Sequence, residues 1–255
     1  MSCGLQTLAR PSCPRQSTSK WQESSSNIWA RFVWFPSSWK DKRMAKYVDS
    51  NKEFERVRNM GHELVRTDTT LPSNVFKRRY DFYRFLDFGW LFNSRHGAWE
   101  TIVRFVQYLT PGPADLLLLD PASESYYSWS GKYGAVRIDS QDRCPEILQI
   151  LSESLKEGTA DAIVFTGNRF IVFSESTSDW CLWADRDYDI AILAVVDCLT
   201  GQELARSWDP RIWCDAERAV DELLITAFLE LTVPDDFRRE FLANYGDKNG
   251  QRRQC

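Results

Sequence analysis

The stretch that decides the fold is residues 160–197, which read ADAIVFTGNRFIVFSESTSDWCLWADRDYDIAILAVVD. It contains four short runs rich in Ile, Val, Phe and Trp, and each run predicts a β-strand. The predicted strands are 161–166, 169–174, 179–184 and 189–196. Because parallel neighbours need a long crossover, the short polar links between the runs predict an antiparallel meander.

Both faces of this predicted sheet are apolar. In the second run, Phe170 and Val172 lie opposite Ile171 and Phe173, whereas a half-buried strand would alternate apolar and polar residues. Helices must therefore cover the sheet on both sides. The covering helices are expected at 98–109, 145–157 and 215–231. The chain is thus expected to adopt an α+β fold with a central, mainly antiparallel sheet covered by helices.

The rest of the chain predicts further elements. A tight hairpin turn is expected at 166–169, where Gly167 and Asn168 tolerate positive φ angles. Residues 74–92 interleave aromatic and charged side chains, which favours a helix. Further expectations are strands at 28–35 and 115–120, a helix at 41–66 broken at 49–51, an aromatic β-like hairpin at 125–138, and a helix at 234–245.

Composition suggests three parts. Residues 1–26 are rich in Ser, Thr, Gln and Pro and are expected to be a disordered tail. Residues 27–246 are expected to form a single domain, and 247–255 a frayed tail. Within the domain, 11 Trp and 15 Phe supply enough apolar volume for a sizeable core.

Charge and cysteine usage bear on the compartment and the partner. Residues 1–95 hold 17 Lys and Arg against 9 Asp and Glu, and residues 96–255 hold 15 against 27. The two halves either attract each other within one fold or present an acidic surface to a basic partner. The seven Cys are widely spaced without a C-x-x-C pair, which predicts reduced thiols and a cytoplasmic protein. No apolar run is long enough to span a bilayer, so we expect no membrane association.

The motifs of many enzyme classes are absent from the sequence. There is no phosphate-binding glycine loop, no nucleophile elbow, and no zinc-type spacing between Cys and the two His, His62 and His96. We therefore expect no cofactor and no metal. A catalytic role stays open only because reactive groups need to be adjacent in space rather than in sequence.

Three carboxylates, Asp185, Asp187 and Asp189, occur at alternate positions of one predicted turn. In an extended chain they would point the same way, so they could bind a hard cation. They could also form an exposed acidic knuckle for a basic partner, or a solvated turn without further function.

The basic and aromatic residues from Lys77 to Arg84 raise the question of nucleic-acid binding, because bases stack on aromatic rings while cations contact phosphate. The alternative is an amphipathic helix with a buried aromatic side and a wet Arg side. Asp81 and Asp87 interrupt the positive charge, so we do not expect a nucleic-acid partner.

A cluster of aromatic residues is the third candidate site. It consists of Tyr126, Tyr127, Trp129 and Tyr133. Tyr and Trp supply much of the energy of protein interfaces, so this cluster could be a binding surface. The alternative is an aromatic hairpin packed on the core.

Two functions follow from these observations. The first is a non-catalytic protein-binding domain, for example a bacterial immunity-type inhibitor, that acts on a basic partner through an acidic and aromatic surface. The second is a metal-dependent hydrolase or nuclease whose carboxylates, Asp185, Asp187 and Glu175 first, converge only in the fold. The sequence does not indicate the oligomeric state.

Overall fold

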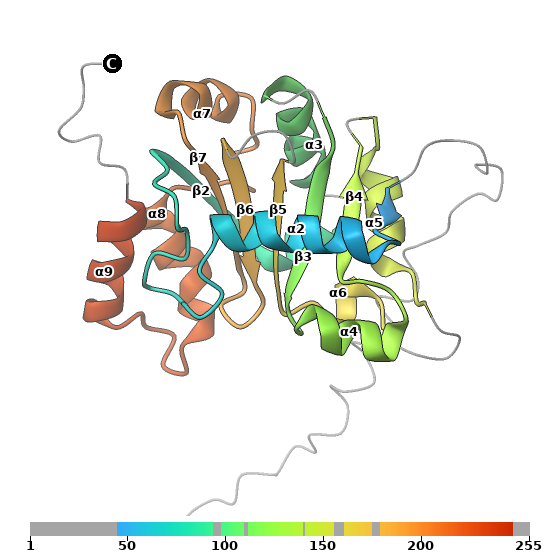
Figure 1. The fold of residues 1–255 in the computed structure, drawn as a ribbon. Coiled ribbons are helices and arrows are strands. Elements are labelled where there is room, and N and C mark those ends of the chain that lie inside the picture. The colour runs from blue at the N-terminus through green and yellow to red at the C-terminus, as the bar shows by residue number, and fades with distance from the viewer. Residues whose placement is uncertain are drawn as a thin grey trace, which may run out of the picture. The chain divides into compact units, whose positions relative to one another are not determined.

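Within the described residues, seven strands form one all-antiparallel sheet in the order β1-β4-β3-β5-β6-β7-β2 (Figure 1). The strands are β1 (Lys46–Tyr47), β2 (Phe82–Asp87), β3 (Ala114–Asp120), β4 (Ala135–Ile138), β5 (Arg169–Ser174), β6 (Trp180–Asp185) and β7 (Ile190–Val195). The predicted antiparallel meander is confirmed for β5, β6 and β7, which lie in the middle of the sheet.

The computed structural model describes residues 45–93, 98–109, 112–139, 141–155, 161–174 and 179–246, all within the unit Arg43–Cys255. The tails expected at 1–26 and 247–255 lie outside these residues, as does the strand expected at 28–35.

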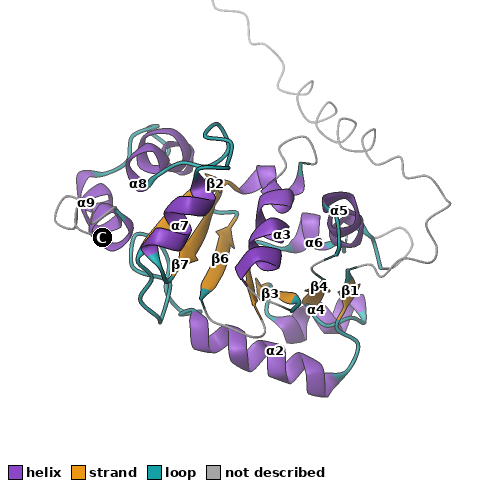
Figure 2. Cartoon of the chain, turned by 90° about the horizontal axis from the view of Figure 1, so that it is seen from above, coloured by secondary structure: helices purple, strands orange, loops and turns teal. Residues whose placement is uncertain are grey.

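Each face of the sheet is buried under its own layer of helices (Figure 2). Phe170 and Val172 point into one core, and Ile171 and Phe173 point into the other, as the sequence predicts. The first core is covered chiefly by α3 (Ala98–Leu109), α5 (Cys144–Ser152) and α7 (Cys198–Ala205). The second is covered by α2 (Asn51–Leu64), by the helical segments α8 (Ala216–Arg218), η2 (Ala219–Leu223) and η3 (Leu224–Ala227), and by α9 (Asp235–Tyr245).

Helix α2 begins where the sequence predicts a break at 49–51. Ser50 accepts a hydrogen bond from the Glu53 backbone N–H and caps the helix. Near its end, Gly61 lies directly on the sheet, because an added Cβ would lie 2.6 Å from Leu117 Cδ2 and 2.9 Å from Ile171 Cδ1. The close approach of α2 to the sheet therefore requires glycine at this position.

The strand expected at 161–166 is wrong, because Ile163–Thr166 forms the single helical turn α6. The edge of β5 that this strand would occupy is taken by β3, which arrives from a distant part of the sequence. The Arg186 side chain donates hydrogen bonds to the carbonyls of Val164 and Gly167, which secures the turn. The hairpin expected at 166–169 is therefore absent.

The helix expected at 74–92 is also wrong. Residues 82–87 form the edge strand β2 beside β7, and η1 (Phe88–Phe92) is a short 3-10 helix. Phe82 points into one core and Phe85 into the other. Since β2 is buried on both faces, its apolar residues do not show the period of two that identifies a strand.

The β-like hairpin expected at 125–138 is half right. Ser123–Ser130 forms helix α4, and only Ala135–Ile138 is a strand, β4. Gly131 ends α4 with a left-handed backbone (φ 74°), the conformation that glycine commonly supplies after a helix. The helix expected at 215–231 is likewise interrupted, since it passes from α-helix through a π-turn to a 3-10 turn and stops at Ala227.

Candidate binding surface

The three carboxylates of the acidic turn do not come together. Asp185 is 1% exposed, and its Oδ2 atom lies 2.7 Å from Nε of Arg169, its neighbour on β5. Its Oδ1 atom accepts a hydrogen bond from the Asp187 backbone N–H. Burial raises the pKa of Asp185, although the bond to Arg169 opposes that shift. Asp185 is therefore an internal partner of Arg169 rather than a surface carboxylate.

The other two carboxylates of the turn have different surroundings. Asp187 is exposed, whereas Asp189 is partly buried and has a left-handed backbone, with φ 52°. Burial raises the pKa of Asp189, and the nearby charge of Asp87 adds to the shift. Among the described residues, no group of three or more His, Cys, Asp and Glu side chains could hold a metal ion. Glu175, the further candidate of the metal-enzyme hypothesis, lies outside the described residues.

The basic and aromatic stretch from Lys77 to Arg84 uses its cations within the fold. Lys77 Nζ donates a hydrogen bond to the His62 carbonyl, and the Arg84 guanidinium lies over the ring of Phe82, 4.2 Å from its centroid. Because Phe82 is buried, its ring is not offered to a base. Lys77 and Arg84 therefore contact the protein itself, although the amphipathic helix considered for this stretch does not form.

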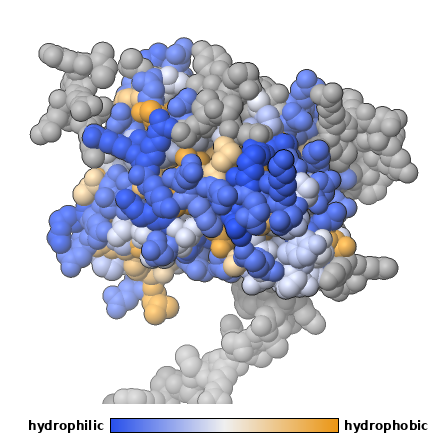
Figure 3. All heavy atoms as spheres, viewed as in Figure 1, coloured by the Kyte–Doolittle hydropathy of each residue, from blue (hydrophilic) through white to orange (hydrophobic). Residues whose placement is uncertain are grey.

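The aromatic cluster divides into a buried anchor and an exposed group. Tyr126 is fully buried in the first core, and its hydroxyl donates a hydrogen bond to the Asp161 carbonyl. Tyr127 and Trp129 are 46% and 42% exposed, and Tyr133 is partly exposed. We call Tyr127, Trp129 and Tyr133 the aromatic surface. Figure 3 draws the region over α4 pale, since Tyr, Trp and Ser are intermediate in hydropathy.

The rings of the aromatic surface are held in place by other rings. Tyr127 stacks on Tyr133 with centroids 4.7 Å apart, and Tyr133 stacks on Phe54 of α2 at 4.6 Å. Trp129 packs edge-to-face against the buried Tyr126 at 5.7 Å. The exposed rings are therefore fixed before any partner arrives.

Polar contacts join α4 to α2 beside these rings. Arg58 forms an ion pair with Glu124 of α4 at 2.8 Å and another with Glu55 of its own helix. The Tyr133 hydroxyl donates a hydrogen bond to the Asn51 side chain at 3.4 Å. The two helices thus form one continuous surface.

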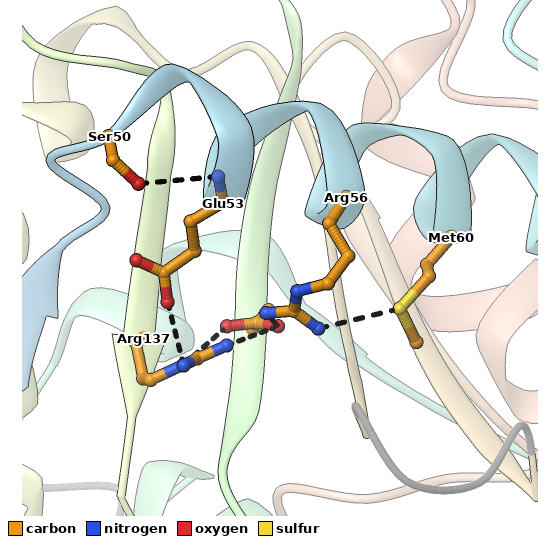
Figure 4. Close-up of polar contacts among 6 residues, drawn as sticks. Ser50, Glu53, Arg56, Met60 and Arg137 are labelled. Carbon is orange, nitrogen blue, oxygen red and sulfur yellow. Dashed lines mark hydrogen bonds and ion pairs between the residues drawn. The ribbon is translucent and has the colours of Figure 1, made fainter.

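A network of charged side chains around one buried carboxylate attaches the first half of α2 to the sheet (Figure 4). Asp115 of β3 is fully buried and accepts hydrogen bonds from Arg137 of β4 at 3.1 and 3.4 Å. Arg137 also pairs with Glu53 at 2.7 Å, and Arg56 lies 3.8 Å from Asp115. Sequence patterns alone do not predict this network, although Asp115 is a charged residue directly before the apolar run from Leu116 to Leu119.

A depression of about 380 Å³ opens above this network. Ser50, Lys52, Glu53 and Arg56 line it. The depression lies next to the aromatic surface, because Asn51 and Phe54, which neighbour its lining residues in sequence, both contact Tyr133. The start of α2 therefore offers a hollow to a partner, next to the rings of the aromatic surface.

Comparisons with known proteins add no assignment, because no family model, curated protein or solved structure matches this chain. None of the described helices combines the length and the hydropathy of a membrane-spanning segment.

Proposed function

We propose that this protein is a non-catalytic domain that binds a partner protein through the aromatic surface Tyr127, Trp129 and Tyr133. The observation that carries the proposal is that Tyr127 and Trp129 are exposed to solvent while neighbouring rings hold their own rings in place. Large aromatic side chains carry much of the free energy of protein interfaces. Fixed rings also lose little conformational entropy on binding.

The composition around α4 supports the same function. Of the 12 residues from Ser123 to Gly134, ten are Ser, Tyr, Trp or Gly. Antibody binding sites are enriched in these residues, because the rings supply contact area while Ser and Gly adapt their hydrogen bonds and backbone. Such a segment suits contact with a protein better than it suits chemistry.

The depression at the start of α2 gives the proposed interface a concave part. A side chain of the partner would enter between Lys52 and Arg56 while its neighbours contact the rings. Binding energy in interfaces concentrates where an anchoring side chain fills such a hollow. An immunity-type inhibitor, which covers the active surface of a toxin, is one form of this proposed function.

The test is affinity capture with the full-length protein from cells of its source, followed by calorimetry with the purified partner. We expect Trp129→Ala to weaken binding by about tenfold or more, which corresponds to the loss of an interface anchor. Phe165→Ala is the matched control, because Phe165 is 53% exposed but does not belong to the aromatic surface.

Melting temperatures of both variants establish that they are folded. A partner that binds wild-type and Trp129→Ala equally would refute the aromatic surface as the binding site. Turnover of a substrate by the purified protein would refute the non-catalytic role itself.

A further inference from the structure

Two leucines on the loop between η3 and α9 point into solvent. Leu229 is 105% exposed and Leu231 is 62% exposed. Figure 3 shows an apolar patch that protrudes at the lower left, over this loop. We call Leu229 and Leu231 the leucine tip. Single exposed leucines are common, whereas exposed apolar patches mark interaction sites.

Packed aromatic rings support the loop that carries the leucine tip. Phe228 packs edge-to-face on Phe237 of α9 at 5.1 Å, and Phe237 contacts Tyr188 of the β6–β7 turn at 6.0 Å. The Leu231 N–H donates a hydrogen bond to the Phe228 carbonyl. Leu231 itself has a left-handed backbone (φ 49°), which costs a branched residue about 1 kcal/mol. The fold therefore presents these leucines on a fixed loop.

The C-terminal segment that carries the leucine tip is acidic. Residues 215–246 contain eight Asp and Glu but only three Arg, and all eight acidic residues are exposed. Each of the three Arg already pairs with one of these carboxylates; the pairs are Arg218–Glu222, Arg238–Asp221 and Arg239–Asp236. Glu230, which lies between the two leucines, forms no ion pair within the described residues.

We propose that the leucine tip and its acidic surroundings bind a basic amphipathic segment of a partner protein. Apolar side chains of that segment would cover Leu229 and Leu231, and its Lys or Arg side chains would face the surplus carboxylates. Complementary charge of this kind speeds association and selects the partner. This inference goes beyond the proposed function, because it uses a surface separate from the aromatic residues of α4.

The charge of the surface argues against two other occupants. A second copy of this chain would bring the same negative surface against itself, which Coulomb repulsion disfavours. An anionic membrane would repel the carboxylates, because such membranes attract basic segments instead. A basic protein segment removes both penalties.

The test uses a fluorescent peptide of about 14 residues that forms a helix with Leu on one face and Lys on the other. Its binding to the full-length protein is followed by anisotropy. Two control peptides replace Lys by Glu or Leu by Ser. We expect the Leu–Lys peptide to bind at least about tenfold more tightly than either control, because each control removes one of the two contacts.

Protein variants locate the site. Leu229→Ser with Leu231→Ser should weaken binding of the Leu–Lys peptide by about tenfold or more, whereas Phe165→Ser should leave it unchanged. Glu230→Lys should weaken binding more than Glu63→Lys, a charge change of equal size on the exposed side of α2. The effect of Glu230→Lys should shrink between about 20 mM and about 300 mM salt, because added ions screen exposed charges. Trp129→Ala separates the two proposals, since it should not alter binding of this peptide.

Four results would overturn the inference. The first is equal binding of the peptide by wild-type and the folded double leucine variant. The second is equal affinity of the wild-type protein for the Leu–Lys peptide and for the peptide with Ser in place of Leu, which would show that charge alone causes binding. The third is dimerisation of the wild-type protein that depends on concentration and is lost in the double leucine variant, which would show that the leucine tip binds a second copy of this chain. The fourth is leucine-dependent binding to phosphatidylcholine vesicles, which would show that the leucine tip binds a membrane.

Discussion

The ring of Tyr133 lies parallel to the ring of Phe54, with the centroids 4.6 Å apart and the planes 13° from parallel. This contact joins the loop after α4 to the buried side of α2, and Tyr127 stacks on its outer end. The positions of the Tyr127 and Tyr133 rings thus depend on a residue in the second core.

Replacing Tyr133 should therefore affect both stability and binding. We expect Tyr133→Ala to lower the free energy of unfolding by about 2 kcal/mol, because it removes two ring contacts and their buried area. Tyr133→Phe keeps both stacks and loses only a long hydrogen bond to Asn51, so it should cost less than about 0.5 kcal/mol. Urea unfolding measures both values. Equal losses for the two variants would show that the hydroxyl, and not the stack, holds the loop.

Asp115 offers a test of the network beneath α2. Asp115→Asn should destabilise the protein by about 3 kcal/mol, because it removes the fully buried negative charge that accepts two hydrogen bonds from Arg137. Glu124→Gln breaks the ion pair with Arg58 but should cost less than about 1 kcal/mol, because the Glu124 side chain is 69% exposed. Chemical denaturation distinguishes the two, and similar small losses would mean that the network contributes little to the attachment of α2.

Asp142 should make stability depend on pH. It is 1% exposed, its Oδ2 atom accepts a hydrogen bond from the Asp139 N–H, and its Oδ1 atom has no hydrogen-bond partner of standard geometry among the described residues. Burial raises the pKa of Asp142 from 3.8 to about 6, and the charges of Asp139 and Glu146 add to the shift. The folded state therefore holds the proton more tightly than the unfolded state does. The resulting stabilisation is fully present below about pH 4 and is lost as the pH rises through about 6.

The measurement is the free energy of unfolding of wild-type and Asp142→Asn from about pH 4 to about pH 7. Relative to the variant, wild-type should lose on the order of 2–3 kcal/mol across this range. Comparison with the variant is needed, because the raised pKa values of Asp185 and Asp189 act in the same direction. Parallel pH curves for the two proteins would exclude a raised pKa at Asp142.

The metal-enzyme hypothesis can be tested by ligand linkage. A divalent ion that binds only the folded state raises the melting temperature. Asp185 already pairs with Arg169, and the described carboxylates form no group that could hold a metal ion. We therefore expect Mg²⁺, Mn²⁺ and Ca²⁺ to leave the melting temperature unchanged. A rise of several degrees with one of these ions, abolished by Asp187→Asn, would restore the hypothesis.

Short-range patterns predict those elements whose neighbours in space are also neighbours in sequence. The β5–β6–β7 meander is of this kind, because each strand pairs with the next one along the chain. The amphipathic spacing of Ala98, Trp99 and Ile102 likewise predicts α3. In contrast, local patterns predict a strand in place of α6 and a helix in place of β2. These predictions are wrong because the pairing of β5 with β3 and of β2 with β7 joins distant segments.

The candidate site divides in the same way. The residue types of the aromatic surface are visible in the sequence, and so is the acidity of the C-terminal part. Only the tertiary structure decides that Tyr126 is buried while Trp129 is exposed, because residues three apart on one short helix are neighbours on its surface. It also decides that Asp185 is an internal partner of Arg169, because strand register sets which charges meet.

The sequence by itself determined that this chain forms an α+β fold around a sheet buried on both faces. Its strands carry apolar residues at consecutive positions, and these point to both faces of the sheet. The tertiary structure alone decided which rings and leucines reach solvent. Exposure depends on which distant segments cover each side chain, and no local pattern encodes that.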